Sequence, residues 1–234
     1  MDALRADPAE GQVTRLADLS PVDLHHLALE TAGRADCVAD YLRLHEQHLR
    51  RLEEHHQATY HHSLRVGLLA AGVAATERHE AGSHVASALL AGVAHDVGKC
   101  AVPGEVLDFP GKPGPAEWAH IQRHPEVGFE LLDDFRQAAV VAGLHHRFQS
   151  NGYGPSRSSI GPVDRRTIAL AKLVWLCDFV DAMTTRRDGS SRIDNPSDTS
   201  AARTVALGVF PGQVRRIDIL LGGAPEELPE AVGQ

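Results

Sequence analysis

The stretch LAGVAHDVGKCAVP, residues 90–103, constrains the fold of this chain more than any other part of it. It begins as a small, apolar helical run and leads directly into His95-Asp96, after which Gly98 lets the backbone turn and Lys99 adds a cation. Imidazole and carboxylate groups both bind iron, manganese and zinc, so an adjacent His and Asp can chelate one metal or bridge to a second. Whether this pair is a metal site depends on whether other His and Asp residues lie on buried helix faces.

Apolar residues at helical spacing predict an all-α fold. One expected helix, residues 60–78, places His62 on the same stripe as Val66 and Val73, so that His62 faces inward. Pro125 removes a backbone donor, which predicts a kink or a new helix start with His124 at the break. The other helices are expected at residues 21–31, 34–57, from about 83 to 94, from 115, 135–144, 167–184, from about 199, and 214–221. Residues 147–162 form a polar, glycine-rich segment that predicts a loop.

Histidine and aspartate recur on or next to the buried sides of five of these helices. The residues are His62, His95, Asp96, His124, His145, His146 and Asp178. So many polar groups in one core would strongly destabilise it without metals to coordinate. They also exceed the three or four protein ligands of a single catalytic zinc, so two metals are the economical inference. We expect the remaining histidines, among them His25, His26, His55, His56, His61, His79, His84 and His120, at the surface or at hinges.

The bulk composition excludes several classes of protein. With 23 Lys and Arg against 31 Asp and Glu, the net charge of −8 argues against a protein that binds polymeric nucleic acid. The three cysteines form no CxxC pair, which indicates a reduced compartment. No apolar run approaches the ~20 residues of a membrane span, and the first residues lack the apolar core of a signal peptide. We therefore expect a cytoplasmic protein without membrane contact.

Residues 34–57 carry a second pattern. Val38, Leu42, Leu49 and Leu52, with His45 between them, step by four and three residues, which is coiled-coil spacing. This seam could form a homodimer or receive a signal. Packing on the chain's own catalytic domain is favoured, because two heptads are too few to define a coiled coil. We accordingly divide the chain into an N-terminal helical extension, residues 1–58, and a main domain, residues 59–234.

The order of the polar motifs is similar to that of a known family. The motifs are His62-Ser63-x-Arg65-Val66, His95-Asp96-x-Gly98-Lys99 with Val102-Pro103, Glu117-Trp118, His124 followed by Gly128, His145-His146, and Asp178-x-x-Asp181-Ala182-Met183-Thr184. Over roughly residues 60–187 this pattern resembles the HD superfamily of metal-dependent phosphohydrolases. The most similar branch is the HD-GYP domains, which hydrolyse cyclic dimeric GMP. The resemblance implies an HD-domain helical bundle around a buried dinuclear metal site.

The resemblance also implies roles for individual residues. All seven inward groups named above would be metal ligands, with Asp96 as the bridge between two divalent ions, iron or manganese before others. Asp96 and Lys99 would be catalytic, while Lys99, Arg187 and Tyr153 would contact the substrate. Asp181 would orient or cap a neighbour instead of binding metal. The implied activity is hydrolysis of cyclic-di-GMP or a related cyclic dinucleotide.

The loop after the second histidine pair departs from the family pattern HHExxDGxGYP. Residues 145–155 read HHRFQSNGYGP, so Arg147 replaces an acid and Gly154 separates Tyr153 from Pro155. Ala58 occupies a position where some members carry a carboxylate for a third metal, and the Tyr-Arg that often follows the last motif is missing. Three alternatives therefore stay open: a phosphohydrolase for another nucleotide or phosphoester, a signalling module that has lost turnover, and a di-iron oxygenase.

Overall fold

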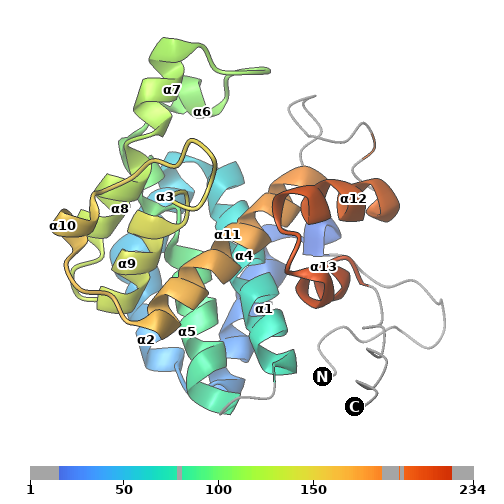
Figure 1. Cartoon of the computed structure of the whole chain (residues 1–234). Helices are drawn as coiled ribbons and strands as arrows, with labels where there is room; N and C mark the ends of the chain where they lie inside the picture. Colours follow the sequence, from blue (N-terminus) through green and yellow to red (C-terminus); the bar gives the residue numbers. More distant parts are fainter. Residues whose placement is uncertain (1–15, 78–80, 186–194, 196–197, 223–234) are drawn as a thin grey trace.

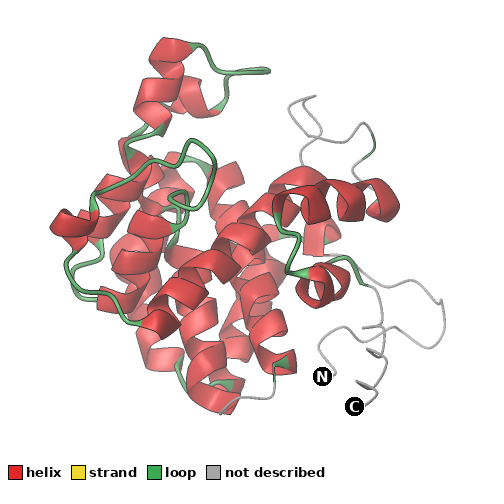
Figure 2. Ribbon diagram, in the orientation of Figure 1, coloured by secondary structure: helices red, strands yellow, loops and turns green. Residues whose placement is uncertain are grey.

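The chain folds into a bundle of helices. The computed structural model describes residues 16–77, 81–185, 195 and 198–222, and every regular element within them is helical (Figures 1 and 2), as predicted. The elements are η1 (Leu16–Asp18), α1 (Pro21–Arg34), α2 (Val38–Leu44), η2 (His45–Leu49), α3 (Arg50–His55), α4 (Gln57–Thr76), α5 (Ala81–Ala94), η3 (Val97–Ala101), α6 (Gly104–Leu107), α7 (Pro115–Ile121), α8 (His124–Leu131), α9 (Arg136–Leu144), α10 (Arg157–Ile160), α11 (Arg165–Thr185), α12 (Thr199–Val209) and α13 (Val214–Leu220).

Helices α4 and α5 form the centre of the bundle. They approach so closely that a Cβ on Gly92 of α5 would lie 2.6 Å from the Cα of Gly67 on α4. Helices α9 and α11 pack against this pair, and Val66, Val141 and Val174 meet in one fully buried cluster. The four helices α4, α5, α9 and α11 are thereby fixed relative to one another, and each carries predicted ligands or leads directly into them.

The helix expected over residues 34–57 runs without a break from residue 38 to residue 55 as α2, η2 and α3, but its four apolar positions do not form one seam. Val38 and Leu42 are 37% and 47% exposed, whereas Leu49 and Leu52 are fully buried in the same cluster as residues of α4 and α5. The cause is η2, which is a π-helical turn and holds one more residue than an α-helical turn. The turn rotates Leu49 and Leu52 away from the face of Val38 and onto the chain's own core, which is the packing that the sequence favoured.

The N-terminal helices also bury a histidine that was expected at the surface. His25 is half-buried, and its Nδ1 lies 3.2 Å from the hydroxyl of Tyr41 and 3.3 Å from the hydroxyl of Tyr60. His45 reaches the same Tyr60 hydroxyl at 3.2 Å. These contacts connect α1, α2 and η2 to the first turn of α4.

The predicted break before Pro125 is confirmed. Helix α8 begins at His124 with Pro125 in its first turn, so proline's missing N–H breaks no helical hydrogen bond. The short helix η3 packs tightly on this start, because a Cβ on Gly98 would collide with the carbonyl oxygen of His124 and lie 2.5 Å from the nitrogen of Gly128. Glycine at position 98 thus lets the segment after His95-Asp96 contact the start of α8 directly.

Helices α12 and α13 cover the C-terminal half of α11, where Val180 packs with Ala202 and Ile217. An ion pair ties α13 to the end of α4, because the guanidinium of Arg216 binds Glu77, with Nη2 2.8 Å from Oε2. None of the described helices combines the length and apolar character needed to cross a bilayer.

Candidate metal centre

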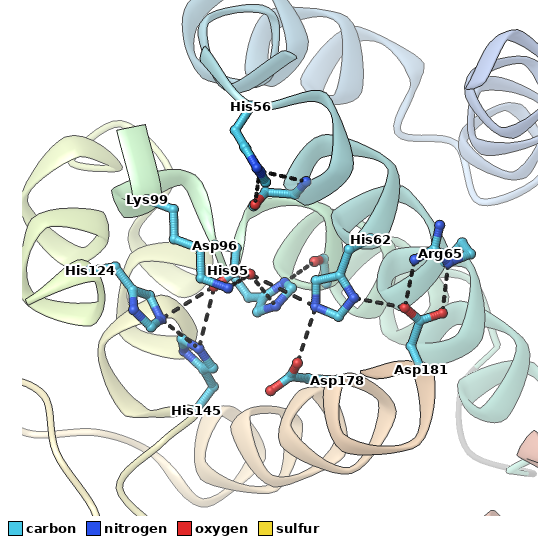
Figure 3. Close-up of polar contacts among 12 residues, drawn as sticks. His56, His62, Arg65, His95, Asp96, Lys99, His124, His145, Asp178 and Asp181 are labelled. Carbon is cyan, nitrogen blue, oxygen red and sulfur yellow. Dashed lines mark hydrogen bonds and ion pairs between the residues drawn. The ribbon is translucent and has the colours of Figure 1, made fainter. Parts of the chain in front are cut away.

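The structure brings all seven predicted ligands together at one place in the bundle. Figure 3 labels all of them except His146. Their ligand atoms form three overlapping groups, within each of which all atoms lie inside 4.8 Å of one another. The groups are His62, His95 and Asp96; His95, His145 and Asp178; and His124, His145 and His146. Asp96 is 1% exposed and lies at the centre (Figure 3). Residues more than a hundred positions apart therefore converge on a single polar core.

Asp96 faces both sides of this core. Its Oδ2 lies 3.4 Å from His95 Nε2 and 3.8 Å from His62 Nε2. Its Oδ1 lies 3.3 Å from His124 Nε2 and 3.9 Å from His145 Nε2. One carboxylate with each oxygen directed at a different pair of imidazoles has the arrangement of a bridging ligand.

Three of the histidines are oriented in the same way. The Nδ1 atoms of His95, His124 and His145 lie 2.8, 2.6 and 2.7 Å from the main-chain carbonyls of Gly92, Ile121 and Ala142, each three residues earlier. A carbonyl only accepts, so each Nδ1 donates, and in a neutral ring Nε2 is left with a lone pair. These lone pairs point into the core, as in metal-ligating histidines whose other nitrogen is held by a carbonyl.

The polar atoms at the centre fit a cation. Burial lowers the pKa of His124 to about 3 and that of His145 to about 4, so both rings are neutral at pH 7. Their Nε2 atoms nevertheless lie 3.3 Å apart. With both Nδ1 atoms protonated, no hydrogen atom lies between these two nitrogens. Within the described part of the chain, His95 Nε2 and Asp96 Oδ1 are also buried without a hydrogen-bond partner. Buried acceptors that face one another are costly unless a positive ion lies between them.

His62 is held differently, by side chains. Its Nδ1 lies 2.7 Å from Oδ2 of Asp181, and Asp181 in turn accepts two hydrogen bonds from Arg65 at 2.8 and 2.9 Å (Figure 3). Its Nε2 lies 3.1 Å from Asp178. Burial opposes charge on this ring, but the hydrogen bonds to Asp178 and Asp181 raise the pKa of His62 to about 9. The surroundings of His62 therefore favour a positive charge between the carboxylates of Asp178 and Asp181.

The sequence analysis did not assign a role to Arg65. Its position contained a signal, because Arg65 follows His62 by three residues and Asp181 follows Asp178 by three residues. On two packed helices, this spacing puts both pairs on facing stripes. Arg65 and Asp181 thus lie behind His62 and fix its ring.

His146 is the fifth histidine of the cluster and is oriented from the loop after α9. Its Nδ1 contacts the side-chain amide of Gln149. The ring of Tyr153 stacks on it, with centroids 4.6 Å apart and planes 26° apart. Tyr153, predicted to contact substrate, therefore lies directly against the candidate metal centre.

Lys99 lies beside the bridge. Its Nζ is 2.6 Å from Oδ2 of Asp96, and its side chain is 15% exposed. Although burial opposes ionisation, Lys99 and the surrounding histidines hold the pKa of Asp96 well below its usual range. Arg187, the other predicted phosphate ligand, lies outside the described residues.

The sequence of this chain is similar to those of several known proteins. The sequence matches the HD domain family over residues 59–183. It is 32% identical over 169 residues to a cyclic di-GMP phosphodiesterase of Pseudomonas aeruginosa, an alignment that covers 68% of this chain and 40% of the relative. It is 30% identical over 135 residues to a cyclic di-GMP phosphodiesterase of Thermotoga maritima, covering 55% and 35% of the two chains.

A third relative has a different named substrate. The 3'3'-cGAMP-specific phosphodiesterase 2 of Vibrio cholerae is 36% identical over 101 residues, which cover 40% of this chain and 18% of the relative. This chain thus spans less than half the length of the curated relatives described here. The family match extends over more than half of the chain and contains every predicted ligand, so the chain belongs to the HD domain family, as its motifs predicted.

Proposed function

We propose that this protein is a metal-dependent phosphodiesterase that hydrolyses cyclic-di-GMP or a related cyclic dinucleotide. The observation that carries the proposal is the buried polar core, where the two oxygens of Asp96 face separate pairs of imidazoles. The names of the relatives support the substrate class, since they are phosphodiesterases for cyclic di-GMP or 3'3'-cGAMP.

Two divalent ions fit the donor set. His62, His95 and Asp178 would hold one ion together with Oδ2 of Asp96. The second group, His124, His145 and His146, would hold the other together with Oδ1 of the same carboxylate. Five imidazoles and two carboxylates suit iron or manganese, which accept mixed nitrogen and oxygen ligands.

The roles of the chain's own residues follow from their positions. When bound, divalent ions would supply an acidified water as the nucleophile and would stabilise charge on a phosphoryl group. Asp96, with one oxygen toward each group of imidazoles, would contact both ions. Lys99, with Nζ 2.6 Å from Asp96, is placed to bind a non-bridging phosphate oxygen as negative charge develops on it. Asp181 and Arg65 hold the ring of His62, and Tyr153 covers His146.

A second candidate keeps the reaction and changes the substrate. The loop that holds Tyr153 carries Arg147, which is exposed, and Gln149 in contact with His146. Arg147 stands where the HD-GYP pattern has an acid. This change favours hydrolysis of another phosphoester if cyclic dinucleotides are not turned over.

The proposal is tested by metal content and hydrolysis measured on one preparation. Protein purified without a metal-affinity tag is analysed for its elements and assayed against cyclic-di-GMP and 3'3'-cGAMP with added Mn²⁺ or Fe²⁺. We expect about two ions per chain and turnover, both lost in the double variant His95→Ala, Asp96→Ala. The matched control is His120→Ala, which removes an exposed histidine of α7 and leaves both intact. Turnover retained in the double variant would refute the proposal.

A further inference from the structure

An exposed tryptophan lies beside the candidate metal centre. Trp118 belongs to α7, which stands out from the bundle together with α6 (Figure 1). It is 41% exposed, although tryptophan is the largest apolar side chain and gains most from burial. The other tryptophan of the chain, Trp175, is half-buried and packs on Phe210 at a ring distance of 4.3 Å.

Trp118 is connected to the centre through a single ring. Its centroid lies 5.8 Å from that of Tyr153, with the two planes at 75°, so the contact is edge to face. Tyr153 stacks in turn on His146, which belongs to the candidate ligand cluster. A row of three rings thus leads from the metal centre to the solvent, and Trp118 is its outer end.

The contact with Tyr153 leaves part of the indole available to a ligand. A residue needed only to hold the Tyr153 loop would be expected to bury its apolar surface. In a nucleotide the base lies one sugar away from the phosphate. A phosphate at the metal centre therefore brings its base to the rim of the site, where an aromatic face can stack on it.

The net charge of the chain gives a second reason to expect that a base stacks on Trp118. The chain carries a net charge of −8, so its overall field does not attract an anionic dinucleotide. Lys99 and the ions of the proposed function would attract the phosphates at the centre and not the bases at the rim. Stacking on an aromatic ring requires no positive charge and accepts any base, because every base has a π-face.

We propose that Trp118 stacks on a purine base of the substrate and thereby sets its affinity and its preference for nucleotides. This inference rests on the proposed function, and it adds a residue to which the proposed chemistry assigns no role. Trp118 is a binding residue at the rim of the site and has no part in activating the water.

The first test is kinetic. Loss of one base stack weakens binding by about 5- to 150-fold. We expect Trp118→Ala to raise KM for cyclic-di-GMP by a factor in that range with kcat nearly unchanged, because the base is bound alike in the ground and transition states. Trp118→Phe, which keeps a π-face, should recover most of the affinity. Trp118→Leu, which keeps apolar bulk without a ring, should behave like Trp118→Ala.

The second test reports binding directly. Trp175→Phe leaves Trp118 as the only tryptophan of the chain, so its fluorescence can be titrated with a hydrolysis-resistant phosphorothioate analogue of cyclic-di-GMP. Stacking on guanine should quench the emission. Because Trp175 contacts Phe148 in the loop after His146, the kinetic constants of the Trp175→Phe protein are measured first and serve as the reference.

The two proposals fail in different ways. If the wild-type protein hydrolyses cyclic-di-GMP and Trp118→Leu matches it in KM, Trp118 only packs against the loop and this inference is overturned. If the analogue leaves Trp118 emission unchanged at saturation, the inference is likewise overturned. If the analogue quenches Trp118 but no cyclic dinucleotide is hydrolysed, the stacking role stands and the proposed function falls.

Discussion

The contact between η3 and α8 predicts that Gly98→Ala will damage both stability and the metal centre. A Cβ at this position would lie 2.5 Å from the nitrogen of Gly128 and 2.9 Å from the carbonyl carbon of His124, where 3.4 Å or more is ordinary. All of the conflicting atoms belong to the main chain, so no side chain can rotate to make room. The two segments must separate by roughly 1 Å, since close-packed interiors have no spare volume.

The magnitude follows from this displacement. Overpacking of a core costs about 1–3 kcal/mol, and rigid main-chain atoms put Gly98→Ala near the upper value. For a chain of this size, about 3 kcal/mol corresponds to a fall in Tm of about 6–12 °C. Because His124 begins α8, the same movement carries its Nε2 away from Asp96. A misplacement of about 1 Å can reduce activity by about a hundredfold.

The assay compares two glycine-to-alanine variants by thermal unfolding and by metal content. Gly72 lies on the exposed side of α4, and a Cβ added to it would meet no atom of another element within 4 Å. Gly72→Ala should therefore raise stability by about 0.5–1 kcal/mol. Both variants add one methyl group. If Gly98→Ala lowers stability and Gly72→Ala raises it, the difference is due to the steric conflict at Gly98. A Gly98→Ala protein that unfolds within about 2 °C of the wild type and keeps its metal would refute the reasoning.

Three further predictions concern charge and metal. Asp181→Asn should weaken metal binding by about 10- to 100-fold, measured by competition with a chelator, because Asp181 fixes His62; unchanged affinity would contradict this role. The Arg216 ion pair lowers the pKa of Glu77, so its stabilisation is present at neutral pH and is lost as the pH falls through that lowered pKa. Unfolding curves of Glu77→Gln should therefore lie below those of the wild type at pH 7 and converge with them in acid, and a constant gap would argue against the pair. Removal of metal by a chelator should lower Tm reversibly, because bound ions stabilise only the folded state; an unchanged Tm would count against a metal centre.

The sequence predicted the ligand cluster because helical periodicity determines which residues face inward. His62 shares a stripe with Val66, and Pro125 marks a helix start regardless of tertiary contacts. The spacing alone does not tell which imidazole nitrogen faces the core, since that depends on hydrogen bonds to carbonyls of folded helices. The bond between Arg65 and Asp181 joins residues 116 positions apart, and only packing brings them together.

The helix expected over residues 34–57 is present from residue 38 to residue 55, but its single seam failed as a prediction for a different reason. A π-helical turn has no strong local signal in the sequence, because it forms where packing rewards the extra residue. Leu49 and Leu52 gain full burial by this turn, while Leu42 remains exposed. Homodimerisation, and the division of the chain at residue 58, stay predictions.

The hydrogen bonds that orient the histidine rings are of two kinds. The two kinds differ in whether a mutation can remove the partner group. His95, His124 and His145 are directed by main-chain carbonyls, which a substitution at the carbonyl-bearing position leaves in place. His62 and His146 are directed by other side chains, which a single codon change can replace. Substitutions outside the candidate ligands can therefore reorient the rings of His62 and His146, while the other three rings keep their orientation as long as the helices persist. In this chain, substitutions of the side chains that hold His62 and His146 are therefore the most direct way to alter the candidate site.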